Sequence, residues 1–308
     1  MFTKKFLMVL LIAAILMTAC ASKAEVTTIN PTPTQLSSPT PTQSSPTSDD
    51  GSVVEGISSG PVGIIAIGHS GLTGYGTDPN NPTHDAKTNS WATGTNPEIN
   101  SIYQRLTAVH PETAEHVINM AQGGALAIDL AFQASVALQE VPAPELVIIQ
   151  TFDNDIRCDG TDPENLKAFS HSLENALKVI VDASPNSHIL LVSQPGRPAE
   201  SAALLENTPD AIAAFTGSGM CDLFDSDGKI NQEHIATLTA IIESYEAEQA
   251  RVCATIPQCS TDNGAFTTYV DGDITYLVPD DWSHLSVEGQ TRLSEIIWPV
   301  ISDLLKLN

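Results

Sequence analysis

Three side chains near opposite ends of the chain are of the types that nucleophilic hydrolysis requires. Ser70 lies on a glycine-rich turn, residues 68–74, directly after the apolar run 62–67. Near the other end, Asp281 and His284 stand three residues apart, just before a predicted helix. A serine becomes a nucleophile when an imidazole accepts its proton and a carboxylate holds the other ring nitrogen. An Asp-x-x-His loop supplies both partners from one turn, although ordinary solvated loops and βα turns also contain these residues.

The elements that must position these side chains alternate between strand and helix. Short apolar runs predict strands at 62–67, 116–120, 145–150 and 188–193. Apolar residues at helical spacing predict helices over 96–109, 123–136, 163–181, 231–252 and 286–305. This alternation predicts an α/β fold, a three-layer α/β/α sandwich with a mainly parallel central sheet. Ser70 then falls at the carboxyl end of the first strand, where such sheets carry their chemistry.

Two further stretches have less regular patterns. Residues 194–229 form the longest irregular stretch, and we expect this insertion to overhang the active edge of the sheet. Residues 267–277 contain an Asp-Gly pair and predict a hairpin or a bent strand. Trp91 and Trp282 are candidates for lining the pocket.

The first 51 residues precede the predicted catalytic domain, residues 52–308. Residues 1–19 carry two lysines before an apolar run of 12 residues, which fits a signal peptide and is short for a membrane span of about 20 residues. The sequence ending at Cys20 resembles a bacterial lipobox, which predicts that Cys20 is lipidated and anchors the protein to the outer face of a bacterial membrane. A plain secreted protein and an uncleaved anchor are the alternatives. Residues 20–51 are rich in Ser, Thr and Pro and predict an extended tether.

The charge of the chain restricts its partners. The sequence has 13 basic and 37 acidic residues, for a formal net charge of −24. So acidic a surface argues against nucleic acid and against anionic substrates. We therefore expect no nucleic-acid partner, and contact with the membrane through the predicted lipid anchor only. The sequence points to no particular oligomeric state.

Four separated blocks resemble those of the SGNH (GDSL-type) esterases and lipases, in the same order and over essentially all of residues 60–308. Gly68-His69-Ser70 corresponds to the family's Gly-Asp-Ser, residues 119–125 (NMAQGGA) to its Asn-rich strand end and glycine, and Asp153-Asn154-Asp155 to the end of Gly-x-Asn-Asp. The last block runs from Asp281 through His284 to Gly289. Two positions depart from the family pattern: His69 replaces an aspartate, and Phe152 replaces a glycine.

The resemblance implies a serine esterase that acts through an acyl-enzyme on Ser70, with His284 as general base and Asp281 orienting it. The oxyanion would be held by the N–H groups of Ser70 and Gly124, with Gly123 as the alternative, and by the side-chain amide of Asn154. The expected substrates are small acyl esters or acyl groups on glycans. The alternative is a catalytically weak relative that binds cell-envelope glycan.

The cysteines other than Cys20 are even in number, and in an exported chain they predict disulfides. Of the three possible pairings, we predict Cys158 with Cys221 and Cys253 with Cys259, and free thiols are the alternative. Residues 225–231 resemble the middle of an EF-hand loop, but Leu223 and His234 occupy positions where such a loop needs oxygen ligands. We therefore expect no metal, and no motif indicates a cofactor.

Overall fold

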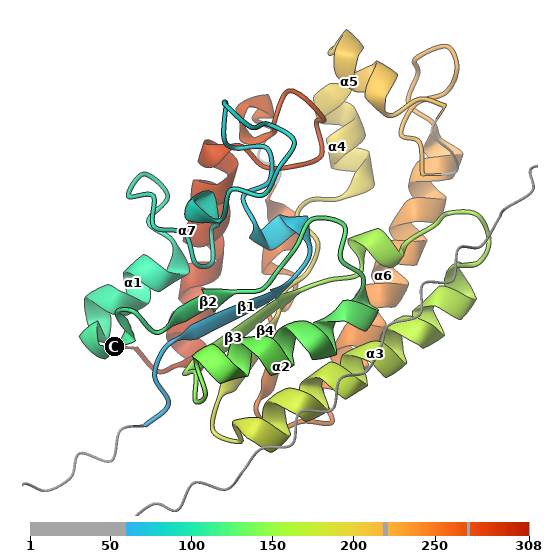
Figure 1. Ribbon diagram of the computed structural model, residues 1–308. Helices are drawn as coiled ribbons and strands as arrows, with labels where there is room; N and C mark the ends of the chain where they lie inside the picture. The colour runs from blue at the N-terminus through green and yellow to red at the C-terminus, as the bar shows by residue number, and fades with distance from the viewer. Residues whose placement is uncertain (1–59, 218–220, 270–271, 308) are drawn as a thin grey trace, which may run out of the picture. The chain divides into compact units, whose positions relative to one another are not determined.

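The computed structural model describes residues 60–217, 221–269 and 272–307 (Figure 1). The predicted signal peptide, the tether and Cys20 lie outside the described residues. Among the described helices, none has the length and hydrophobicity that a membrane span requires.

A parallel sheet forms the centre of the domain, as predicted. Its order is β2 (Val117–Asn119), β1 (Ile64–Gly68), β3 (Leu146–Gln150), β4 (His188–Leu191) and β5 (Cys259–Thr261). Every neighbouring pair is parallel. β1 to β4 follow the apolar runs of the sequence. β5 was not predicted, because three residues reading Cys-Ser-Thr carry no apolar pattern.

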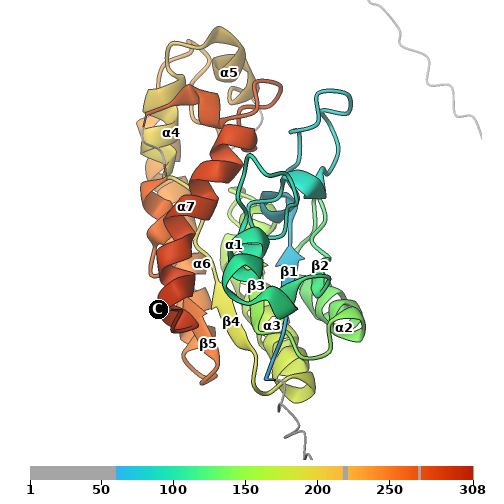
Figure 2. The ribbon, with the colours of Figure 1, turned by 90° about the vertical axis from the view of Figure 1, so that its left-hand side faces the viewer.

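Helices cover both faces of the sheet (Figures 1 and 2). One face packs against α2 (Leu130–Glu140), α3 (Asp162–Ala183) and α6 (Gln232–Cys253). The opposite face packs against α1 (Ile102–Val109) and α7 (Val287–Leu304). Alternate side chains of each strand therefore enter different cores, which explains why the strands are apolar at nearly every position.

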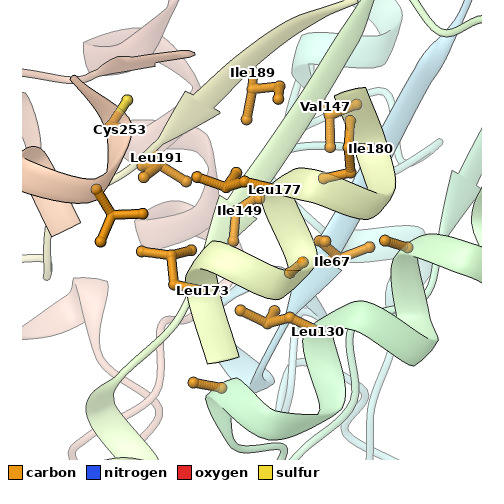
Figure 3. Packing of buried hydrophobic residues seen from close by; sticks show 14 of the residues in the cluster. Ile67, Leu130, Val147, Ile149, Leu173, Leu177, Ile180, Ile189, Leu191 and Cys253 are labelled. Carbon is orange, nitrogen blue, oxygen red and sulfur yellow. The ribbon is translucent and has the colours of Figure 1, made fainter. Parts of the chain in front are cut away.

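The core beneath α3 fixes the strands in place (Figure 3). Ile67 of β1 and Ile149 of β3 are fully buried there, together with Leu173 and Leu177 of α3. Each such side chain contributes roughly 1.5–3 kcal/mol when it leaves water. The carboxyl ends of β1 and β3 are thereby held as rigid supports for the loops that follow them.

Three predictions of local structure need correction. The stretch 194–229 is not irregular, since it carries α4 (Pro198–Leu205) and α5 (Pro209–Ala214). The expected hairpin at 267–277 is replaced by two 3-10 turns, Ala265–Thr268 and Ile274–Tyr276. The predicted helix 96–109 begins only at Ile102.

The late start of α1 has a local cause. The Ser101 hydroxyl accepts a hydrogen bond from the Gln104 N–H, and the Gln104 side chain accepts one from the Ser101 N–H. This reciprocal capping box fixes the first turn at Ser101 and leaves residues 96–100 in turns.

Both predicted disulfides are present. Cys158 is bonded to Cys221, and Cys253 to Cys259. The first bond joins the loop after β3 to the end of the 194–229 insertion, and the second joins the end of α6 to β5.

Candidate active site

The turn after β1 presents Ser70 at the edge of the sheet. β1 ends at Gly68, whose φ is 139° and whose missing side chain leaves room for the Gln150 carbonyl of β3. The chain then enters a 3-10 turn, Ser70–Leu72. The Ser70 carbonyl accepts hydrogen bonds from the N–H and the hydroxyl of Thr73, at 3.0 Å each. Ser70 thus lies on a short, internally bonded turn above the junction of β1 and β3.

Ser70, His284 and Asp281 come together, although 214 residues separate the first two. The Ser70 Oγ lies 2.8 Å from His284 Nε2, and His284 Nδ1 lies 2.7 Å from Asp281 Oδ2. The Asp281 carboxylate also accepts the N–H groups of Ser283 and His284, at 3.0 Å each. This geometry is the hydroxyl–imidazole–carboxylate relay that nucleophilic catalysis uses.

The His284 loop is held at both ends. The Val278 N–H donates to the His284 carbonyl at 2.8 Å, which closes the loop at its base. The Ser286 hydroxyl then accepts the Gly289 N–H and caps α7. The ring of Tyr75 packs against the His284 imidazole with a centroid distance of 4.4 Å.

Asp281 remains ionised across the neutral range. Partial burial raises the pKa of Asp281, but hydrogen bonds from the His284 side chain and from the N–H groups of His284 and Ser283 outweigh it and hold the pKa at about 2. An ionised carboxylate at His284 Nδ1 keeps the proton on that nitrogen, so Nε2 is free to accept the Ser70 proton.

The three predicted oxyanion donors occupy the same end of the sheet. Within the described residues, the N–H groups of Ser70 and Gly124 form no hydrogen bond, so both remain available. The Asn154 amide donates one of its two N–H groups to the Ala125 carbonyl at 3.0 Å, and the other is free. The Gly123 N–H, the alternative to Gly124, is occupied by Asp85 Oδ2 at 3.1 Å.

One cavity of about 370 Å³ opens beside Ser70. Ser70, Asn154 and His284 line it, whereas Gly124 does not. Trp282 also lines it, as expected, but Trp91 is fully buried and its indole N–H donates to the Gly71 carbonyl at 3.0 Å. The expectation for Trp91 is therefore wrong: its ring supports the Ser70 turn from inside the core.

The solved structures that are similar to this chain include two lipases. An extracellular lipase from Streptomyces rimosus is 16% identical, with a TM-score of 0.50 over 79% of this chain and 99% of the lipase. A lipase from a goat rumen metagenome is 13% identical, with a TM-score of 0.50 over 77% of this chain and 95% of that lipase. No protein-family model and no curated protein sequence matches the chain. The fold is that of the SGNH hydrolases.

The SGNH topology explains why the four sequence blocks converge. The sheet order places β1 between β2 and β3, so the chain reverses its direction of winding beside β1. Sheets of this kind bind ligands in the crevice at that switch point. Ser70 follows β1, Gly124 follows β2 and Asn154 follows β3, and the last block reaches them from the loop before α7.

The first departure from the SGNH pattern, His69, is buried behind Ser70. Its Nδ1 accepts the Gly71 N–H at 3.1 Å, and its Nε2 lies 3.5 Å from Asp153 Oδ2. Burial lowers the pKa of His69, while the Asp153 carboxylate opposes this shift. Burial also raises the pKa of Asp153, against the influence of His69. His69 is therefore a neutral imidazole with its proton on Nε2, facing Asp153.

The second departure, Phe152, has a backbone conformation that glycine adopts more easily than other residues. Its φ is 85°, in the left-handed region that glycine favours. Its side chain is 1% exposed and packs edge-on against Phe169, with centroids 6.2 Å apart, and beside Tyr245 at 5.7 Å. The aromatic contacts hold the residue in a conformation that its side chain disfavours.

Sequence analysis did not identify Asp85 or Tyr75 as part of this site. The Asp85 carboxylate accepts the Thr73 hydroxyl at 2.7 Å and the Gly123 N–H at 3.1 Å, so it ties the Ser70 turn to the Gly123–Gly124 turn. Neither residue lies in a motif or a periodic segment, and no signal in the sequence marks them.

The EF-hand-like loop has a structural explanation. Asp225 Oδ1 accepts the N–H groups of Asp227 and Lys229, at 2.8 and 3.0 Å, and its main chain pairs with Lys229. Across the described ranges 60–217, 221–269 and 272–307, acidic, His and Cys side chains form no cluster that would hold a metal ion.

Proposed function

We propose that the protein is a serine carboxylic ester hydrolase that forms an acyl-enzyme on Ser70. The observation that carries this proposal is the chain of contacts from Ser70 Oγ through His284 to Asp281, at 2.8 and 2.7 Å, beside an accessible cavity. The SGNH fold supports it, because the two similar structures at a TM-score of 0.50 are both lipases. The expected substrates are small acyl esters or acyl groups on glycans.

In this mechanism, His284 Nε2 takes the Ser70 proton as Oγ attacks the ester carbonyl carbon. The carbonyl oxygen becomes negative and is held by the N–H groups of Ser70 and Gly124 and by the Asn154 amide. His284 then returns the proton to the departing alcohol oxygen, which leaves the acyl group bonded to Ser70. Water, activated by His284, attacks this ester in the second half and releases the acid.

The alternative, a catalytically weak glycan-binding protein, depends on the departures at His69 and Phe152. Phe152 keeps the glycine-like backbone beside Asn154, and His69 keeps a hydrogen bond to the Ser70 turn. Neither departure disturbs the contacts of Ser70, so the site favours the esterase.

Labelling with a fluorophosphonate tests the proposed function. The wild type should be labelled on Ser70 and should hydrolyse p-nitrophenyl acetate, and Ser70→Ala should lose both activities. Ser201→Ala is the matched control, because Ser201 lines the same cavity from α4 and makes no hydrogen bond with Ser70, His284 or Asp281. A wild type that resists labelling and hydrolyses no ester would refute the esterase and support the glycan-binding alternative.

We further propose that the protein is an extracytoplasmic lipoprotein anchored through Cys20. The two disulfides support export, because such bonds persist in oxidising compartments. Metabolic labelling with a fatty acid should tag the wild type and not Cys20→Ala. An untagged wild type found in the medium would instead indicate a secreted protein.

A further inference from the structure

The insertion between β4 and α6 builds an apolar wall onto the candidate active site. α4 and α5 stand beyond the carboxyl ends of the strands (Figures 1 and 2). Buried residues of the insertion form a small core with Ile235 of α6, and these residues are Ala202, Leu205, Ala211, Leu223 and Phe224. The Cys158–Cys221 bond ties the end of this insertion to the loop after β3, close to Asn154 in sequence. The described residues of this insertion are therefore a folded part of the domain.

Apolar side chains of this insertion and of α6 line the same cavity as Ser70. They are Leu204, Leu205, Phe215, Leu223, Leu238 and Ile242. Leu205, Leu223 and Ile242 are at most 5% exposed, so this wall is continuous with the core. Apolar lining of this kind gains free energy when an apolar group replaces water.

Two opposite charges beside this wall neutralise each other. Arg197 Nη2 lies 2.6 Å from Glu246 Oε2, and both side chains are about one-fifth exposed. The Glu246 carboxylate also accepts the Gln194 N–H at 3.2 Å. Because the two charges satisfy one another, neither is left to attract or repel a bound acyl group.

We propose that this wall is the acyl-binding site and that the enzyme prefers esters of medium-length, unbranched fatty acids over acetyl esters. The inference rests on the proposed function, because it concerns the acyl group that Ser70 would accept. It narrows the expected substrates: the alcohol can be a small molecule or a sugar, but the acyl group is an apolar chain. Leu204 and Phe215 set its length from the α4 and α5 sides.

The dependence of kcat/KM on the length of the acyl chain tests this inference directly. Each fully buried methylene is expected to raise kcat/KM about fourfold. Even if only two of the additional methylenes are buried, wild-type kcat/KM should rise at least about tenfold from p-nitrophenyl acetate through butyrate to octanoate, at concentrations below micelle formation. Leu204→Trp narrows the cavity and should lower the octanoate-to-acetate ratio by a similar factor.

Ala203→Trp is the matched control, because Ala203 is exposed on the same helix and does not line the cavity. It should leave the octanoate-to-acetate ratio unchanged. Phe215→Ala widens the cavity from the α5 side and should move the preferred chain upward, toward decanoate. Leu204→Trp should shorten the preferred acyl chain and Phe215→Ala should lengthen it. A folding defect in one of these two variants therefore leaves the other informative.

The outcomes separate this inference from the proposed function. A protein that is labelled on Ser70 and hydrolyses acetate best, with no effect of Leu204→Trp on the ratio, would refute the acyl site and leave the esterase intact. A protein that is neither labelled nor active on any ester would refute both. A rise with chain length that Leu204→Trp abolishes and Ala203→Trp preserves would establish the acyl site.

Discussion

The backbone conformation of Phe152, close to Asn154 in the chain, can be tested by comparing the stabilities of two variants. At this position glycine should be more stable than alanine, whereas at most positions in a protein alanine is the more stable. Both Phe152→Ala and Phe152→Gly remove the same buried ring, which costs about 3–5 kcal/mol of unfolding free energy. At φ 85°, however, alanine pays the left-handed penalty of roughly 1–2 kcal/mol, and glycine does not. We therefore expect Phe152→Gly to be more stable than Phe152→Ala by about 1 kcal/mol.

Phe169 is the matched control for this comparison. Its ring packs against that of Phe152, and both side chains are 1% exposed, but Phe169 lies inside α3. In a helix interior glycine is less favourable than alanine by about 1 kcal/mol. At position 169 the order should therefore reverse, with the alanine variant the more stable.

Urea unfolding of the four oxidised variants, followed by circular dichroism, gives the two differences. The comparison within each position cancels the loss of the ring, so only the backbone contribution remains. If the alanine variant is more stable than the glycine variant at both positions, the left-handed conformation of residue 152 does not determine the difference in unfolding free energy. Aromatic packing would then not be holding a strained backbone at Phe152, and another cause would have to explain its left-handed conformation.

Three further predictions concern donors and carboxylates around the site. Asn154→Ala should lower kcat about 10²- to 10³-fold, because one oxyanion donor is lost. The domain should stay folded, since the lost hydrogen bond to the Ala125 carbonyl costs only about 1–3 kcal/mol of unfolding free energy. Wild-type turnover in this variant would remove Asn154 from the oxyanion set. Asp85 accepts two hydrogen bonds, and Asp85→Asn replaces one of its acceptor oxygens by a donor, so kcat should fall about tenfold. The control, Asp78→Asn on an exposed loop, should leave kcat unchanged. Equal kcat values for the two variants would show that Asp85 does not position the Gly123–Gly124 turn. Burial raises the pKa of Asp155 to about 6, so its ionisation opposes folding and stability should fall as the pH rises from about 4 to 6. In Asp155→Asn the loss of unfolding free energy between pH 4 and pH 7 should be smaller than in the wild type by about 1 kcal/mol, after allowance for the partial exposure of Asp155. A variant whose unfolding free energy changes between pH 4 and pH 7 as that of the wild type does would contradict this prediction.

The sequence predicted the parts of the fold that depend on burial. The runs at β1 to β4 are apolar on both faces because helices cover both faces, and this pattern is visible without any structure. β5 was missed because its three residues, Cys-Ser-Thr, form no apolar run. The Cys253–Cys259 bond and the pairing with β4 hold this strand in the sheet. The helices α4 and α5 were missed because each is short, and their buried side chains pack against other residues of the insertion and against α6.

The candidate site was predicted in the positions that motifs mark, and not in the positions that only contacts reveal. Ser70, Asp281, His284 and Asn154 stand at strand ends or in the loop before α7, where type and spacing suffice. Asp85 acts through two hydrogen bonds to distant segments, and Trp91 through one to Gly71. Such contacts depend on how loops fold over the sheet edge, and a single sequence does not encode them in a recognisable pattern.

The electrostatics around Ser70 explain why a histidine suits position 69. Asp153 lines the cavity beside Ser70, and a carboxylate there would oppose the negative charge that develops on an ester carbonyl oxygen. An aspartate at position 69, as in the SGNH pattern, would add a second carboxylate facing the first, and like charges at such range disfavour ionisation of both. His69 keeps the acceptor for the Gly71 N–H through Nδ1 and turns its Nε2 proton toward Asp153. The histidine therefore preserves the support of the Ser70 turn without bringing a second negative charge to Asp153.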